Sequence, residues 1–80
     1  MKSRFMNPVA VGAIVRSTRK ALRMRQDELA GAAGVGVRFI VELEAGKPGA
    51  HLGKTLQVLS ALGCSIEITP PADPSGGSRL

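Results

Sequence analysis

The sequence predicts a small all-α domain of four helices, followed by one short C-terminal β-strand that pairs across a dimer. Three observations predict this fold. Apolar residues recur at helical spacing in four segments, glycine directly follows three of these segments, and residues 64–69 alternate between polar and apolar side chains. A chain of 80 residues, 44% of them hydrophobic, is long enough for one such domain.

The first helix is predicted from Pro8 to about Met24. Asn7 is a favourable N-cap, and proline suits the first helical position because its missing N–H would have no partner there. The apolar side chains at near-helical spacing are Val11, Ile14, Val15 and Leu22. The other face carries Arg16, Arg19, Lys20 and Arg23. This helix is therefore expected to be amphipathic and basic.

Two short helices are predicted next. The first runs from Gln26 to Ala33, has two acidic residues in its first turn and is followed by Gly34. The second runs from Val37 to Ala45, with Ile40 and Leu43 facing inward, and Gly46 stands where a C-terminal cap is needed. Leucines at 52, 56, 59 and 62 then predict a fourth helix that ends at Gly63.

The alternating segment 64–69, with the sequence CSIEIT, is predicted to be a strand that ends at Pro70-Pro71. A single strand leaves its backbone N–H and C=O groups without partners, so we expect it to pair with its copy in a homodimer. The alternative is that the strand folds back on residues 4–6 of the same chain. The predicted dimerisation residues are Leu59, Leu62, Cys64, Ile66 and Ile68.

The remaining segments are assigned from composition. We expect residues 1–7 to be a flexible N-terminal arm and residues 8–63 to form the domain. Residues 70–80 are rich in proline, glycine and serine, which predicts a disordered tail.

The charge favours a polyanionic partner. Lysine and arginine number 11 against 6 acidic residues, giving a net charge of +5 and a pI of about 10.4. Two phenylalanines are the only large aromatic side chains, which disfavours stacking on single strands and leaves duplex DNA as the better candidate. A basic, solvated surface without any partner is the alternative.

Composition also argues against several other classes. One cysteine cannot form an intramolecular disulfide, and no apolar run approaches the roughly 20 residues of a membrane span, so a cytoplasmic location is expected. One cysteine and one histidine cannot build a metal cluster. His51 has no partner at a catalytic spacing and is read as a surface-loop residue. We therefore expect neither an enzyme nor a cofactor.

The segment 26–45 has the pattern of a helix-turn-helix. Two helices that cross closely need a small side chain at the contact, which Ala30 supplies. The turn needs a residue that adopts the left-handed conformation without strain, which is glycine at position 34. A helical hairpin in any small bundle is the alternative reading of this spacing.

These residues resemble the phage repressor/Cro (XRE-type) helix-turn-helix family. The resemblance lies in Gln26–Ala30, Gly34-Val35 and residues 40–46, and it covers residues 8–63. It implies that the start of the third helix contacts DNA bases through Gly36, Val37, Arg38, Val41 and Glu42. It also implies a structural ion pair between Arg19 and Glu44.

Among these positions, arginine is the strong reader, because Arg38 can donate two hydrogen bonds to guanine. Val37 can touch a thymine methyl group. Gly36 stands where the family often has serine or threonine, which removes a side-chain cap or a phosphate contact. Phosphate contacts are expected from Gln26 at a helix N-terminus and from the flanking Arg25 and Lys47, with a simple solvated cation as the alternative for Arg25.

Phe39 has two candidate roles. The favoured one is packing at the edge of the motif, and the alternative is contact with the DNA.

The chain is most similar, within that family, to HipB-type antitoxins. This resemblance lies in Lys47-Pro48, the leucine-rich fourth helix, Leu62-Gly63 and the short strand. It implies a homodimer that binds palindromic operator DNA in the bacterial cytoplasm, in association with the nucleoid, together with a HipA-type kinase toxin. The alternatives are a stand-alone XRE-type regulator, an accessory DNA-binding subunit, or a protein-interaction module with incidental basic charge.

Overall fold

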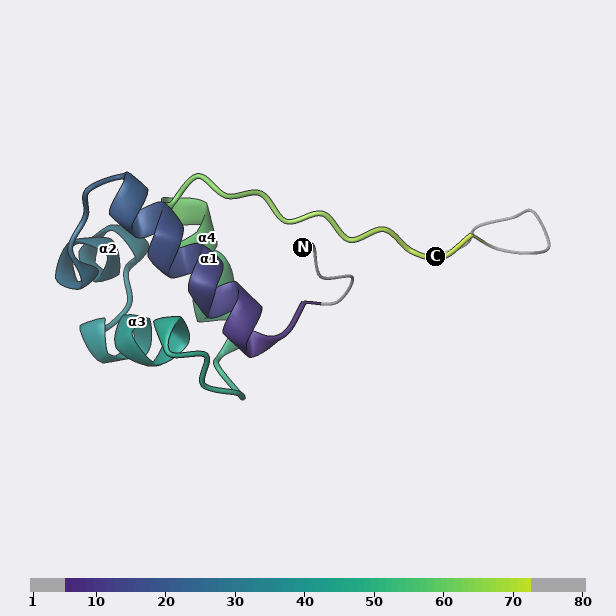
Figure 1. Cartoon of the computed structure of the whole chain (residues 1–80), viewed down its shortest axis with the longest axis horizontal. Helices are drawn as coiled ribbons and strands as arrows, with labels where there is room; N and C mark the ends of the chain where they lie inside the picture. Colours follow the sequence, from purple (N-terminus) through teal and green to yellow (C-terminus); the bar gives the residue numbers. More distant parts are fainter. Residues whose placement is uncertain (1–5, 73–80) are drawn as a thin grey trace.

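The computed structural model describes residues 6–72 and contains four helices. They are α1 Pro8–Ala21, α2 Gln26–Ala33, α3 Val37–Glu44 and α4 Leu52–Ala61. Helix α3 packs against α1 and α2, and α2 also packs against α4 (Figure 1). The predicted all-α fold of four helices is confirmed.

The core takes one fully buried side chain from each helix: Val15, Leu29, Ile40 and Val58. Smaller or nearly buried residues complete it, namely Ala30, Ala33, Leu43, Leu59 and Leu62. This core, to which every helix contributes, fixes the position of α3, because α3 buries Ile40 and Leu43 and leaves its other side exposed.

Several residues counted toward the apolar faces are in fact exposed. On α1 and just after it, Ile14 and Leu22 are 40% and 51% exposed. On α4 the exposed fractions of Leu52 and Leu56 are 69% and 44%, so the leucine stripe is only partly a core stripe.

Helix α1 begins where the sequence predicts. The Asn7 side chain accepts a hydrogen bond from the Ala10 N–H at 2.8 Å, and Pro8 occupies the first position. The predicted end at Met24 is wrong, because the helix stops at Ala21 and Arg23 turns the chain with a φ of 59°. The Arg23 N–H donates to the Lys20 carbonyl and the Met24 N–H to the Arg19 carbonyl, a Schellman motif made without glycine.

The predicted strand is not present within residues 6–72 of a single chain. Residues 64–72 continue as an extended segment that runs away from the helices, drawn in green to yellow in Figure 1. The alternative pairing involves Arg4 and Phe5, which lie outside the described residues, as do most of the predicted arm and residues 73–80 of the predicted tail. Asn7, assigned to that arm, is the cap of α1.

Candidate nucleic-acid interface

The turn between α2 and α3 has the geometry expected of a helix-turn-helix. Gly34 has a φ of 75°, which lies in the left-handed region that strains other L-residues. The N–H groups of Gly34 and Val35 donate to the Ala30 carbonyl at 2.9 and 3.0 Å. Ala30 is buried at 4% exposure, so a small side chain stands beneath the turn. The close turn therefore fixes α3 relative to α2.

The predicted reading residues lie on one outward side of α3. Val37 and Val41 are 46% and 45% exposed, and the Arg38 side chain is 89% exposed. Gly36 is the N-cap and supplies no side-chain hydrogen bond, so the backbone at the start of α3 is open. An α-helix with its side chains is about 10–12 Å across, which fits the roughly 12 Å width of the major groove. The helix can therefore present this side to base edges.

Glu42 connects two cations of this surface. Its carboxylate accepts a hydrogen bond from Arg38 Nε at 3.4 Å and lies 3.3 Å from Lys47 Nζ. Arg38 is one turn earlier on α3, whereas Lys47 belongs to the loop after the helix. The three residues form an exposed group, which we call the Glu42 triad.

A buried ion pair holds the motif to α1. The Arg19 guanidinium donates to Glu44 through Nε at 2.6 Å and Nη2 at 3.0 Å, and through Nη1 to the Met24 carbonyl at 2.8 Å. The side chains of Arg19 and Glu44 are only 9% and 2% exposed. Arg19 therefore ties α1, the turn before α2 and the end of α3 together.

The pKa values of this pair follow from its surroundings. Burial pushes the pKa of Glu44 upward, but the hydrogen bonds from Arg19 and Gln26 outweigh burial and leave it below its ordinary value. The hydrogen bond to Glu44 raises the pKa of Arg19 despite its burial. Both groups are therefore held in their charged forms.

Gln26 and Arg25, predicted as phosphate contacts, already have protein partners. The Gln26 amide donates to Glu44 Oε1 at 3.2 Å, and at the N-terminus of α2 the Arg25 N–H donates to Glu28 Oε1 at 2.8 Å. Arg25 is exposed and lies 3.0 Å from Asp27 and 3.7 Å from Glu28. The hydrogen bond from Arg25 lowers the pKa of Asp27, so these carboxylates offset the charge of Arg25.

The predicted dimerisation residues fall into two groups. Leu59 and Leu62 are buried in the core of a single chain, which leaves them little surface to offer a second copy, and Cys64 is partly buried against that core. Ile66 and Ile68 are 51% and 85% exposed on the extended segment. A contact between copies is therefore left mainly to the two isoleucines.

Sequence reasoning overlooked three supporting contacts. Gly12 is buried, and a Cβ atom there would meet the backbone carbonyl oxygens of Leu43 and Glu44. His51 caps α4, with Nδ1 accepting from the Lys54 N–H at 3.2 Å. Lys54 in turn stands 5.9 Å from the centre of the Phe39 ring, which is partly buried against the core. The histidine could have been found as a cap, whereas the close approach at Gly12 needs the tertiary structure.

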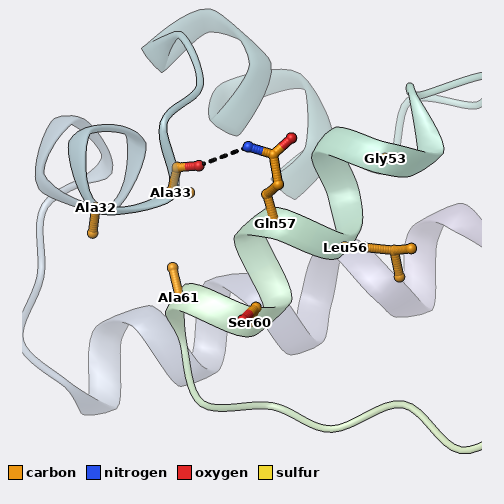
Figure 2. A pocket seen from close by; sticks show the side chains of 7 residues that line it. All are labelled: Ala32, Ala33, Gly53, Leu56, Gln57, Ser60 and Ala61. Atoms are coloured by element: carbon orange, nitrogen blue, oxygen red, sulfur yellow. Dashed lines mark hydrogen bonds between the residues drawn. The ribbon is translucent and has the colours of Figure 1, made fainter.

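Gln57 also links α2 to α4. Figure 2 shows its amide nitrogen donating to the Ala33 carbonyl, at 3.1 Å, beside a shallow hollow of about 420 Å³. The hollow is lined by Ala32, Ala33, Gly53, Leu56, Gln57, Ser60 and Ala61. This lining has no ionisable side chain, and the hollow lies on α2 and α4 rather than on α3, so it is not part of the candidate interface.

Residues 6–72 also bear on metal binding and membrane insertion. In that part of the chain, no three His, Cys, Asp or Glu side chains gather where they could hold a metal ion. None of its four helices has the length and apolar character that crossing a membrane requires.

The comparisons with known proteins agree with this geometry. No family model matches the chain. The chain is 60% identical over 73 residues to the uncharacterized HTH-type transcriptional regulator y4mF of Sinorhizobium fredii, covering 91% of this chain and 96% of that protein. A solved structure described as MDT Protein is 19% identical, with a TM-score of 0.75 over 86% of this chain and 97% of that one, which shows a shared fold. The chain belongs to the helix-turn-helix (HTH) type transcriptional regulators.

Proposed function

We propose that the protein represses transcription by binding duplex operator DNA, with α3 in the major groove. The observation that carries this proposal is the exposed side of α3, where Val37, Arg38 and Val41 project from a helix fixed by the turn at Gly34. The net charge of +5 favours attraction to phosphates.

Base recognition is assigned mainly to Arg38, and Lys47 is assigned to the DNA backbone. Arginine can donate two hydrogen bonds to guanine, which is worth about 1–3 kcal/mol of discrimination. The two valines offer apolar contact to thymine methyl groups. With a single long polar reader among Gly36, Val37 and Arg38, much of the affinity is expected to come from phosphates.

Binding-site selection from a randomised duplex library, followed by fluorescence anisotropy, tests this function. Arg38→Ala should weaken binding to the selected site by about 1–3 kcal/mol and relax its sequence preference. Lys47→Ala should weaken binding to every duplex and reduce the salt slope by about one. Lys20→Ala removes the same charge from α1, outside the motif, and controls for net charge. Equal sequence preference in wild type and Arg38→Ala would refute the role of Arg38.

We further propose that the operator is palindromic and that a homodimer reads it. Pairing of segment 64–69 with its copy would satisfy backbone groups that have no strand partner within residues 6–72. Two copies of α3 related by a two-fold axis would then enter successive major grooves about 34 Å apart. The dimer therefore implies two related half-sites in the selected DNA.

The partner that we propose is a HipA-type kinase toxin, with the protein acting as its antitoxin in the bacterial cytoplasm and repressing their shared operon. This pairing rests on the resemblance of the loop at Lys47-Pro48, the leucine-rich α4 and the C-terminal segment to HipB-type antitoxins. Purification of the tagged chain from its native host, with mass spectrometry and sequencing of bound DNA, tests it. Recovery of a kinase with a promoter fragment supports the pairing, and DNA without a protein partner indicates a stand-alone regulator.

A further inference from the structure

The Glu42 triad places a carboxylate between the two cations assigned to DNA. Both oxygens of Glu42 are engaged, Oε2 by Arg38 at 3.4 Å and Oε1 by Lys47 at 3.3 Å. The side chain is still 37% exposed, so a DNA duplex lying on α3 would bring its phosphates toward the same carboxylate. This negative charge opposes the attraction on which DNA binding depends.

Helix stability does not account for this arrangement. Glu42 is in the last turn of α3, where the helix dipole disfavours a negative charge. Arg38 is in the first turn, where the dipole disfavours a positive charge, and a cation four residues before an acid is the weaker order for a helical pair. The neighbouring Glu44 is explained by its buried pair with Arg19, whereas Glu42 has no buried partner.

We propose that Glu42 is a specificity-determining residue that lowers the affinity of the protein for DNA lacking its operator sequence. This inference rests on the proposed DNA-binding function. On any duplex, the contacts with Glu42 compete with phosphate and base for Arg38 and Lys47, and the carboxylate repels nearby phosphates. On the operator, the hydrogen bonds of Arg38 to guanine offset this cost, and Glu42 can accept a hydrogen bond from the amino group of cytosine. Glu42 therefore lowers the affinity for non-operator DNA more than the affinity for the operator.

The contacts within the Glu42 triad also predict how strongly removal of Glu42 changes the DNA affinity when Arg38 and Lys47 are present or absent. Because Glu42 acts in part through Arg38 and Lys47, its removal should change the DNA affinity more while these cations are present than after they are removed. A carboxylate that merely changed the net charge would have the same effect in every background. This difference separates a specificity role from a general electrostatic one.

The test measures binding of the full chain to a fluorescent duplex of random sequence over a range of salt concentrations. Glu42→Gln should tighten binding roughly three- to tenfold at physiological salt and steepen the salt slope by about one. Asp73→Asn makes the same charge change outside the helix-turn-helix motif and outside residues 64–69, and is the matched control. In an Arg38→Ala/Lys47→Ala background, Glu42→Gln should tighten binding by a smaller factor than it does in the otherwise wild-type chain. Circular dichroism would verify that each variant is folded.

Binding-site selection supplies the second readout, because Glu42→Gln should recover a less restricted set of sequences than wild type. Similar affinities and similar selected sequences for wild type and Glu42→Gln, or equal effects of Glu42→Gln and Asp73→Asn, would overturn the inference while leaving DNA binding intact. Absence of salt-dependent duplex binding by both wild type and Glu42→Gln would overturn the proposed function together with the inference.

Discussion

At the scale of single residues, Arg19 determines how α3, the helix proposed to contact the DNA bases, is held against α1. Its guanidinium is shared between the Glu44 carboxylate and the Met24 carbonyl, and Gln26 donates to the same carboxylate. Burying two charges costs desolvation energy, which several hydrogen bonds offset here. No buried side-chain N or O atom lacks a hydrogen-bond partner within residues 6–72. The network therefore positions α3 without leaving an uncompensated charge.

The first prediction concerns acid stability. The pKa of Glu44 is lowered in the folded protein, so its carboxylate stabilises the fold above the unfolded pKa of about 4.3. This contribution is lost as the pH falls through the lower folded pKa. Urea unfolding between about pH 7 and pH 3 should therefore show a declining free energy of unfolding. Glu44→Gln should cost about 3 kcal/mol at neutral pH and make the decline shallower.

The control for this experiment is Glu67→Gln, which removes an exposed carboxylate from the C-terminal segment. It should leave both the neutral-pH stability and the acid dependence close to wild type. If Glu44→Gln retained the wild-type decline with acid, the carboxylates responsible would lie elsewhere in the chain.

At the scale of helices, the contact between α1 and the end of α3 depends on a missing side chain. Gly12 lies in α1, and a Cβ atom added to it would come within 3.0 Å of the Glu44 carbonyl oxygen and closer still to that of Leu43. These are backbone atoms, so they cannot move aside as a flexible side chain can. The absence of a side chain at this position therefore sets how closely the two helices approach.

The second prediction compares two glycine substitutions. Gly12→Ala should lower the free energy of unfolding by about 1–3 kcal/mol because α3 must shift. Gly31 lies in α2, and apart from its chain neighbours and the backbone of its own helix no described atom comes within 4 Å of a Cβ atom built there. Gly31→Ala should therefore raise stability by about 0.5–1 kcal/mol through better helix propensity. Opposite signs in thermal unfolding are expected, and equal effects would contradict the close contact at Gly12.

These contacts show what the sequence could and could not predict about the elements. Local signals located most helix boundaries, because Asn7 caps α1 and Gly34, Gly46 and Gly63 all have positive φ after the other helices. The end of α1 was missed because Arg23 adopts the left-handed conformation that normally signals glycine.

Properties that depend on tertiary distance were out of reach of the sequence. Helical spacing cannot distinguish Leu56, which is exposed, from Leu59, which is buried. It also cannot show that Gln26 turns toward Glu44, or that Glu42 lies between Arg38 and Lys47. The reading residues on α3 came from the family resemblance, and the structure supplies their exposure and their partners.

At the scale of the whole molecule, the four helices form a domain whose core is complete in one chain, while the C-terminal segment extends beyond it. Ile66 and Ile68 alternate with polar residues there and remain exposed. Burial of two isoleucines and formation of a two-stranded ladder would both favour a second copy. The proposed dimer therefore depends on a segment that the fold of one chain does not need.

Because the extended segment is separate from the helical core, a substitution there should change the dimer without changing the fold, which is the last prediction. Ile66→Pro removes a backbone donor from the proposed ladder, so it should shift the protein from twice the chain mass of 8.3 kDa toward that mass in sedimentation. The helical circular dichroism should stay unchanged, because position 66 lies outside the core. Ala72→Pro, in the same extended segment but beyond residues 64–69, should leave the dimer intact. Operator affinity should fall with the dimer, since each monomer then binds one half-site alone. A wild-type protein that sediments at the chain mass would refute the dimer, and a dimeric Ile66→Pro would move its interface away from this segment.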